Sequence, residues 1–204
     1  MAVHLRTSPA RLPAEVPEVP IRQTDEALVA RAQAGEPWAE EAIFRRHAPG
    51  LLKLAIKLVG DRSEAEDVVQ ETFVLALESL PKLRDGGALG GWLKQITLSR
   101  AHRRFRRRRL LRWLGFQDTP NDGAPERVPT HDTMEPRAEL SWLYRCLEAL
   151  PSDERIAWTL RHLEELDLST VAELSGCSLA TTKRRLARAQ AHIDRHLAGP
   201  GGAR

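Results

Sequence analysis

Three carboxylates that share one face of an expected helix are the residues best placed to do metal chemistry. Glu64, Asp67 and Glu71 follow one another at steps of three and four residues, which brings side chains together on a helix. Such a cluster could hold a divalent cation beside a basic groove, as in a nuclease. No histidine or further carboxylate is placed to complete an octahedral site, so the sequence favours a solvated acidic face. It predicts no catalytic residue, no metal, no cofactor and no enzyme.

Two other sets of candidate ligands are weaker. His192 and His196 have the i, i+4 spacing of a zinc pair, but no third ligand is evident. Cys146 and Cys177 lie far apart and form no CxxC motif. Two packed, reduced thiols are the better interpretation, and they are typical of a cytoplasmic chain.

The charge of the chain changes sign between two neighbouring segments. Residues 61–78 contain six acidic residues and one arginine, whereas residues 100–112 contain eight arginines and no acidic residue. The net charge is only +3, with an isoelectric point of about 9.2, so the distribution of charge matters more than its sum. One chain therefore offers a cation-binding and an anion-binding surface, and nucleic acid is the leading partner class.

Helices are expected to position these residues. Apolar residues recur at helical spacing and no alternating strand pattern is present, so the fold class is all-α. Two short helices, separated by a break at Gly35-Glu36-Pro37, are expected between 25 and 47. The other expected helices cover 49–59, the acidic stretch from an N-cap at Ser63 with a capping box to Glu66, a segment from about Trp92, and then 138–149, 152–163, 168–175 and 179–197.

The composition divides the chain into two small helical domains joined by a flexible linker. The expected parts are a flexible arm at 1–23, a helical domain at 24–114, a linker at 115–137, a second helical domain at 138–198 and a disordered tail at 199–204. Repeated prolines set the arm and the linker apart. The most apolar window, 51–59, is interrupted by Lys53 and Lys57, so no membrane insertion is predicted.

The second domain is expected to contain a helix-turn-helix. Asp167 can cap its short helix, residues 175–178 make a turn around Gly176, and Ser178 can cap the long helix. One face of the long helix is polar and basic, so it either is simply solvated or enters the major groove of DNA. The candidate DNA-binding residues are Ser178, Thr181, Lys183, Arg184, Arg185 and Arg188. Among them, Lys183 is expected to touch phosphate.

These pieces, in this order, resemble a sigma-70 family factor of the extracytoplasmic-function (ECF) group. The resemblance covers about 25–197 without the linker. It is carried by Leu28-Val29-Ala30-Arg31-Ala32-Gln33-Ala34-Gly35, by Ala65-Glu66-Asp67-Val68-Val69-Gln70-Glu71-Thr72-Phe73 with Trp92-Leu93-Lys94-Gln95-Ile96, and by Val171-Ala172-Glu173-Leu174 with Thr181-Thr182-Lys183-Arg184-Arg185-Leu186-Ala187-Arg188-Ala189. The middle motif is the most specific of the three.

The resemblance implies a factor that binds core RNA polymerase, directs it to promoters and helps to open the DNA. The acidic helix would dock on the clamp helices of the largest subunit through Glu64, Asp67, Gln70 and Glu71, with a further contact at the flap region. An anti-sigma factor is a further partner that the resemblance implies.

The resemblance also implies that the first domain reads and melts the minus-ten promoter element and that the last helix reads the minus-thirty-five element. The candidate minus-ten residues are Trp92, Lys94, Ser99, Arg100, Arg103, Arg104 and Arg107. Trp92 and Phe105 can instead belong to the core, and Arg106 to Arg109 can be a non-specific polyanion patch. Ser99 falls where the family often has asparagine, and Ser169 and Thr170 replace the usual acidic pair near Asp167.

A stand-alone helix-turn-helix transcriptional regulator is the alternative. It would account for the C-terminal third of the chain, but it would leave the acidic helix and the Trp92 region without a role.

Overall fold

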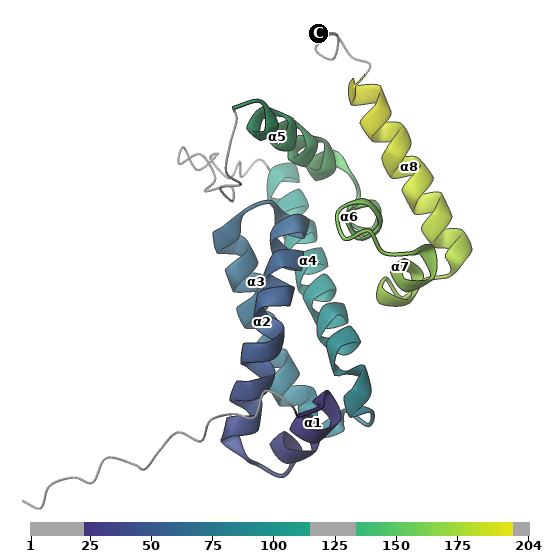
Figure 1. Cartoon of the computed structure of the whole chain (residues 1–204). Coiled ribbons are helices and arrows are strands. Elements are labelled where there is room, and N and C mark those ends of the chain that lie inside the picture. The colour runs from purple at the N-terminus through teal and green to yellow at the C-terminus, as the bar shows by residue number, and fades with distance from the viewer. Residues whose placement is uncertain (1–22, 115–133, 198–204) are drawn as a thin grey trace, which may run out of the picture.

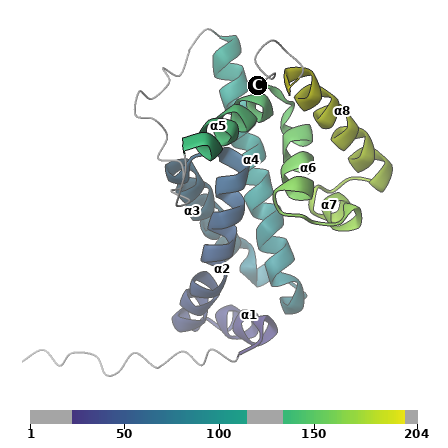
Figure 2. The same cartoon turned by 45° about the horizontal axis from the view of Figure 1, so that its top comes forward.

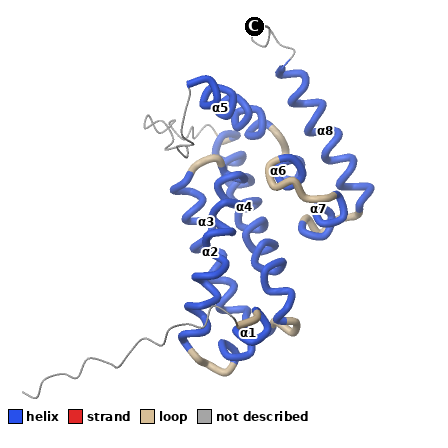
Figure 3. The backbone as a smooth tube through the Cα atoms, viewed as in Figure 1, coloured by secondary structure: helices blue, strands red, loops and turns tan. Residues whose placement is uncertain are grey.

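The computed structural model describes residues 23–114 and 134–197, and within these ranges it contains helices and no strand. The expected tail, residues 1–22 of the expected arm and residues 115–133 of the expected linker lie outside the described residues. Residues 134–137 were also expected in the linker, but they are helical, so the helix expected at 138–149 begins four residues earlier. The α-helices are α1 (Asp25–Gln33), α2 (Pro37–Val59), α3 (Arg62–Ser79), α4 (Leu89–Trp113), α5 (Met134–Ala149), α6 (Ser152–His162), α7 (Leu168–Leu174) and α8 (Leu179–Leu197). Two 3-10 turns, η1 (Leu80–Lys82) and η2 (Gly86–Ala88), join α3 to α4. Figure 3 shows the short loops that connect most of these helices. The all-α prediction is confirmed.

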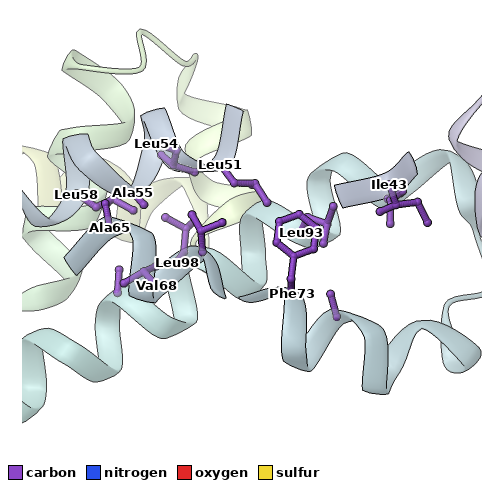
Figure 4. Packing of buried hydrophobic residues seen from close by; sticks show 14 of the residues in the cluster. Ile43, Leu51, Leu54, Ala55, Leu58, Ala65, Val68, Phe73, Leu93 and Leu98 are labelled. Carbon is purple, nitrogen blue, oxygen red and sulfur yellow. The ribbon is translucent and has the colours of Figure 1, made fainter. Parts of the chain in front are cut away.

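The first domain is a bundle of α2, α3 and α4 with α1 across one end (Figure 1). Its core is made mainly of leucine, valine and alanine from all of these helices, including Leu54, Leu58, Val68 and Leu93. Figure 4 shows side chains of α2, α3 and α4 meeting in this core. The buried hydroxyls of Thr72 and Thr97 lie 3.3 Å apart, and each also reaches the carbonyl four residues earlier in its own helix.

α2 corrects one expectation. The sequence suggested that a helix ends before Pro49 and that a new one starts there, but α2 runs through Pro49 without a break. A proline inside a helix costs about 3 kcal/mol. The buried residues on both sides of Pro49, such as Ile43 and Leu51, belong to the same core, so packing of one continuous apolar stripe outweighs the lost hydrogen bond.

The start of α3 is a second correction. Asp61, and not Ser63, is the N-cap, because its carboxylate accepts the backbone N–H of Glu64 at 2.9 Å. Ser63 lies inside the first turn and is exposed. The predicted capping box from Ser63 to Glu66 is therefore wrong, although the acidic helix itself is where it was expected.

The second domain contains the expected helix-turn-helix in α7 and α8. Asp167 caps α7 by accepting the backbone N–H of Thr170, and the Ser178 hydroxyl accepts the N–H of Thr181 at the start of α8. Gly176 in the turn has a φ of 60°, a left-handed conformation that favours glycine. Leu147 from α5, Trp158 from α6 and Ile193 from α8 are among the residues of a separate small core.

The two domains pack against each other. α6 lies between α4 and α8 in both views of the ribbon (Figures 1 and 2). Ile156, Leu160 and Val171 of the second domain join the core of the first. The second domain is therefore held against α2 and α4.

Candidate functional site

The acidic face of α3 is exposed as the sequence predicts. Asp67, Gln70 and Glu71 point outward, while Glu64 is half-buried. Ala65 and Val68 on the opposite face are buried in the core. The helix therefore presents carboxylates on a rigid support.

Arginines from α4 reach this acidic face. A guanidinium nitrogen of Arg104 is 3.1 Å from a carboxylate oxygen of Asp67 and 4.0 Å from one of Glu71, and Arg104 also donates to the backbone carbonyl of Glu64. Arg108 pairs with the Glu64 carboxylate. The structure thus brings a residue expected at the minus-ten element onto the candidate polymerase-binding face, so the two candidate sites are contiguous.

Three exposed apolar residues border the same face, and the sequence reasoning missed them. Val74 is 53% exposed, Leu77 is 38% exposed and Phe44 from α2 is 48% exposed. The ring of Phe44 contacts that of Phe73, with centroids 4.7 Å apart. The signal was present in the sequence, because steps of three from Glu71 lead to Val74 and then to Leu77 on the polar side of the helix.

The candidate minus-ten residues on α4 fall into two groups. Lys94, Ser99, Arg103 and Arg107 are exposed. The half-buried ones are Trp92, Arg100 and Arg104. Phe105 is buried in the core. An aromatic side chain that the prediction did not include, Trp113, is 80% exposed at the end of this helix.

The arginines of the recognition helix α8 also differ in their exposure. Lys183, Arg184 and Arg188 are exposed, whereas Arg185 is half-buried. The Arg185 guanidinium lies 2.7 Å from a carboxylate oxygen of Asp153 in α6 and 3.3 Å from the Cys177 sulfur. Arg185 is therefore engaged by α6 and by the turn before α8, whereas Arg184 is exposed.

A cavity of about 380 Å³ lies where the two domains meet. It brings Ser99 of α4 and Arg185 of α8 to the same space, with Asp153 and His102 beside them. Its remaining lining residues are Gln95, Leu98, Ile156, Leu174, Ser175 and Gly176. Residues expected at two different promoter elements thus face each other across one cavity.

The carboxyl group of Asp167, the N-cap of α7, has a strongly lowered pKa. Hydrogen bonds from the Ser169 hydroxyl, and then from the backbone and hydroxyl of Thr170, hold the pKa of the Asp167 carboxyl well below its usual range. Ser169 and Thr170 thus both support the N-cap of α7.

The histidine, cysteine and carboxylate side chains that could bind a metal are not clustered in the described part of the chain. No group of three or more histidine, cysteine, aspartate or glutamate residues is arranged there to hold a metal ion. The rings of His192 and His196 are 4.3 Å apart, and burial lowers the pKa of His192. Cys146 and Cys177 are free thiols, and burial raises the pKa of Cys146.

None of the described helices has an apolar segment long enough to cross a membrane.

Comparisons with known proteins cover both domains. The sigma-70 region 2 family matches residues 43–110, and the sigma-70 region 4 family matches residues 140–193. The RNA polymerase sigma-H factor of Pseudomonas aeruginosa is 29% identical over 188 residues, which cover 86% of this chain and 95% of that protein. The ECF RNA polymerase sigma-E factor of Haemophilus influenzae is 30% identical over 181 residues, which cover 85% of this chain and 95% of that protein.

Two solved structures have a similar fold. The sigma factor RpoE from Bartonella quintana, solved in complex with the anti-sigma factor NepR, has 25% identity and a TM-score of 0.54, covering 78% of this chain and 97% of its own. CnrH, solved in complex with the cytosolic domain of CnrY, has 23% identity and a TM-score of 0.59, covering 88% of this chain and 100% of its own. The CnrH likeness is evidence for the fold alone.

The two matched regions contain the acidic helix, the arginine-rich helix and the helix-turn-helix in the expected order. The chain belongs to the sigma-70 family and is an RNA polymerase sigma factor of the extracytoplasmic-function group.

Proposed function

We propose that the exposed face of α3 docks on the clamp helices of the largest subunit of core RNA polymerase. The observation that carries this assignment is an exposed acidic face bordered by exposed apolar side chains on one rigid helix. Asp67, Gln70 and Glu71 supply charge and hydrogen-bond acceptors, while Val74 and Leu77 supply apolar area. Protein interfaces combine an apolar centre with a polar rim in this way.

The arginine-rich helix α4 is proposed to bind the minus-ten element. Lys94, Arg103 and Arg107 are exposed and carry the positive charge that a DNA backbone attracts. Ser99 lies on the same helix and can donate a hydrogen bond. Arg104 is assigned a second role, since its contacts with Asp67 and Glu71 couple the position of α4 to that of the docking helix.

The recognition helix α8 is proposed to read the minus-thirty-five element. Arg184 and Arg188 are one turn apart and exposed, so both can lie along a major groove. Ser178 and Thr181 are at the N-terminal end of the helix, where recognition helices approach base edges. Lys183 is assigned to phosphate.

The proposed domain boundaries follow these roles. Residues 24–114 carry polymerase docking and the minus-ten contacts, and residues 138–198 carry the minus-thirty-five contacts.

The flap region of polymerase is the proposed contact of the second domain. An anti-sigma factor is a proposed partner, supported by the RpoE structure, which was solved with one. The protein is proposed to act in the cytoplasm by binding polymerase and promoter DNA, and not by catalysing a reaction.

The alternative function, a stand-alone regulator, is supported less well by the similarity to known proteins. The sigma factors reported above align with 84% or more of this chain and not only with its helix-turn-helix. A regulator would bind duplex DNA tightly without polymerase, whereas a sigma factor is expected to co-purify with core polymerase and to bind promoter duplex weakly alone.

Run-off transcription tests the proposed function. Core polymerase alone and core polymerase with this protein are compared on a fragment library of the host genome. New, discrete start sites are the expected result, and they would also give the two promoter elements. A folded protein that produces no new start sites would refute the assignment.

A further inference from the structure

We propose that the C-terminal tip of α4 binds the surface of an anionic lipid bilayer. The tip patch is defined as Arg106, Arg109, Leu110, Trp113 and Leu114. This binding is peripheral, because the tip lies among the lipid headgroups and no segment of the chain crosses the bilayer. The inference goes beyond the proposed function, which assigns none of these five residues to polymerase or to DNA.

The tip patch combines exposed apolar and exposed cationic side chains. Trp113 is 80% exposed, Leu110 is 55% exposed and Leu114 is 51% exposed. Arg106 and Arg109 are also exposed. The five residues follow one another at steps of three and four, so they are neighbours on one side of the helix. A contiguous group of exposed apolar side chains beside polar ones marks an interaction site, whereas single exposed apolar residues do not.

The tip patch lies where α4 has left the helical bundle. Arg108 pairs with Glu64, which belongs to the first turn of α3, so the residues after Arg108 extend past the start of that helix. Figure 2 shows the last turns of α4 projecting beyond the neighbouring ends of α2 and α3. Phe105, one turn before the patch, is still buried in the core. The patch is therefore a protruding surface and not a groove.

The side-chain chemistry of the tip patch distinguishes a bilayer from nucleic acid. Phosphate groups of either partner attract the two arginines. Single-stranded DNA binds through backbone charge and through bases stacked on aromatic rings, but Leu110 and Leu114 supply neither charge nor a ring. A bilayer interface accommodates all three kinds of side chain, because arginine lies at the headgroups, tryptophan at the interface and leucine against the acyl chains.

A fluid surface also suits the shape of the tip patch. A protein partner would have to supply a groove that matches a protruding helix end. Lipids rearrange around an inserted side chain, so a bilayer needs no preformed groove. Charge complementarity and shape together assign the patch to an anionic bilayer.

The arginines should make the binding depend on anionic lipid and on salt. Each arginine near an anionic surface strengthens binding by about fivefold. The double variant Arg106→Gln with Arg109→Gln should therefore bind vesicles of phosphatidylcholine and phosphatidylglycerol about 25-fold more weakly at low salt. The unmodified chain should bind vesicles of phosphatidylcholine alone much more weakly than the anionic vesicles.

The decisive variant removes apolar area from the tip patch and leaves every charge in place. Leu110→Ser with Leu114→Ser should weaken binding to the anionic vesicles by about tenfold or more, because two half-exposed leucines no longer enter the apolar layer. The matched control is Leu179→Ser with Leu197→Ser, two leucines of α8 that are 45% and 50% exposed. Binding of the full chain is measured by co-sedimentation with vesicles, and thermal unfolding of each variant checks that it is folded.

Tryptophan fluorescence reports whether the tip itself enters the bilayer. Trp113 is exposed, whereas the other four tryptophans are half-buried or buried. Brominated lipid quenches tryptophan near the acyl chains, so it should quench the unmodified chain on anionic vesicles. Trp113→Phe keeps an apolar ring and should still bind, but this quenching should be lost.

Binding to anionic vesicles that the Leu110/Leu114 variant loses and the α8 control retains would support the inference. An unmodified chain that does not bind these vesicles would overturn it, and so would equal binding by the Leu110/Leu114 variant, which would leave only charge attraction. Self-association or binding of a single-stranded oligonucleotide that depends on these leucines, without vesicle binding, would assign the patch to another partner and also overturn it. Failure of run-off transcription would refute the proposed function and leave the vesicle result unchanged.

Discussion

Reversing the charge of Asp67 should separate polymerase docking from folding. The Asp67 side chain is 57% exposed, and within the described residues it pairs with Arg104 at 3.1 Å. Exposed pairs of this kind contribute about 0.2–1 kcal/mol, so Asp67→Arg should lower the free energy of unfolding by no more than about 1 kcal/mol. A like charge placed in a complementary interface costs several kcal/mol. If that cost is about 3 kcal/mol, the affinity for core polymerase falls by about 100-fold.

The assay is a titration of fluorescently labelled sigma factor with core polymerase, with thermal unfolding of each variant measured alongside it. Asp194→Arg is the control, because it makes the same charge change at an exposed position of α8, outside the proposed docking face. Glu71→Lys should behave like Asp67→Arg. The DNA affinity of the second domain should not change in either variant. Unaltered core affinity in both would show that the docking face is assigned to the wrong surface.

Other changes test the local structure and the DNA contacts. Gly60→Ala should cost about 1–3 kcal/mol in the free energy of unfolding, measured by denaturant titration, because Gly60 has a φ of 80° and faces Tyr144; no loss would refute the close packing there. The pKa of Asp167 is lowered in the folded chain, so its stabilising effect is present above the ordinary pKa of about 4 and is lost as the pH falls below it. Asp167→Asn should flatten that part of the pH–stability profile, and an unchanged profile would contradict the assigned cap. Arg184→Ala should cost about 1–3 kcal/mol on the mapped upstream element and little on a scrambled duplex, whereas Lys183→Ala should weaken both and reduce the salt dependence by about one counterion; equal losses for Arg184→Ala on both duplexes would indicate a phosphate contact.

Much of the fold could be predicted because it depends on local patterns. The α8 bounds, Leu179–Leu197, agree with the prediction, since an apolar stripe and the Ser178 cap lie within the segment itself. The same holds for the cap of α7 at Asp167. The outward direction of Asp67 and Glu71 followed from helical periodicity alone.

The errors occurred where two local signals competed. Proline predicts a helix break, yet the core on both sides of Pro49 keeps α2 continuous. Asp61 and Ser63 were both acceptable N-caps by residue type. The choice of Asp61 depends on which residue has extended backbone before the first turn, and Asp61 has a φ of −131° and a ψ of 135°.

The sequence alone determined which segments become helices, which of their faces are charged and in which order the surfaces follow along the chain. These properties depend on residue type and spacing within a few turns. Only the tertiary structure decided which charges remain free, because the partners of Arg104, Arg155 and Arg185 lie 32 to 97 residues away along the chain. Arg184 and Arg185 are adjacent and chemically identical, yet packing of α6 against α8 turns one toward solvent and the other onto Asp153. Spacing within one helix carries no information about such contacts, because they form only when helices that are distant in the sequence pack against each other.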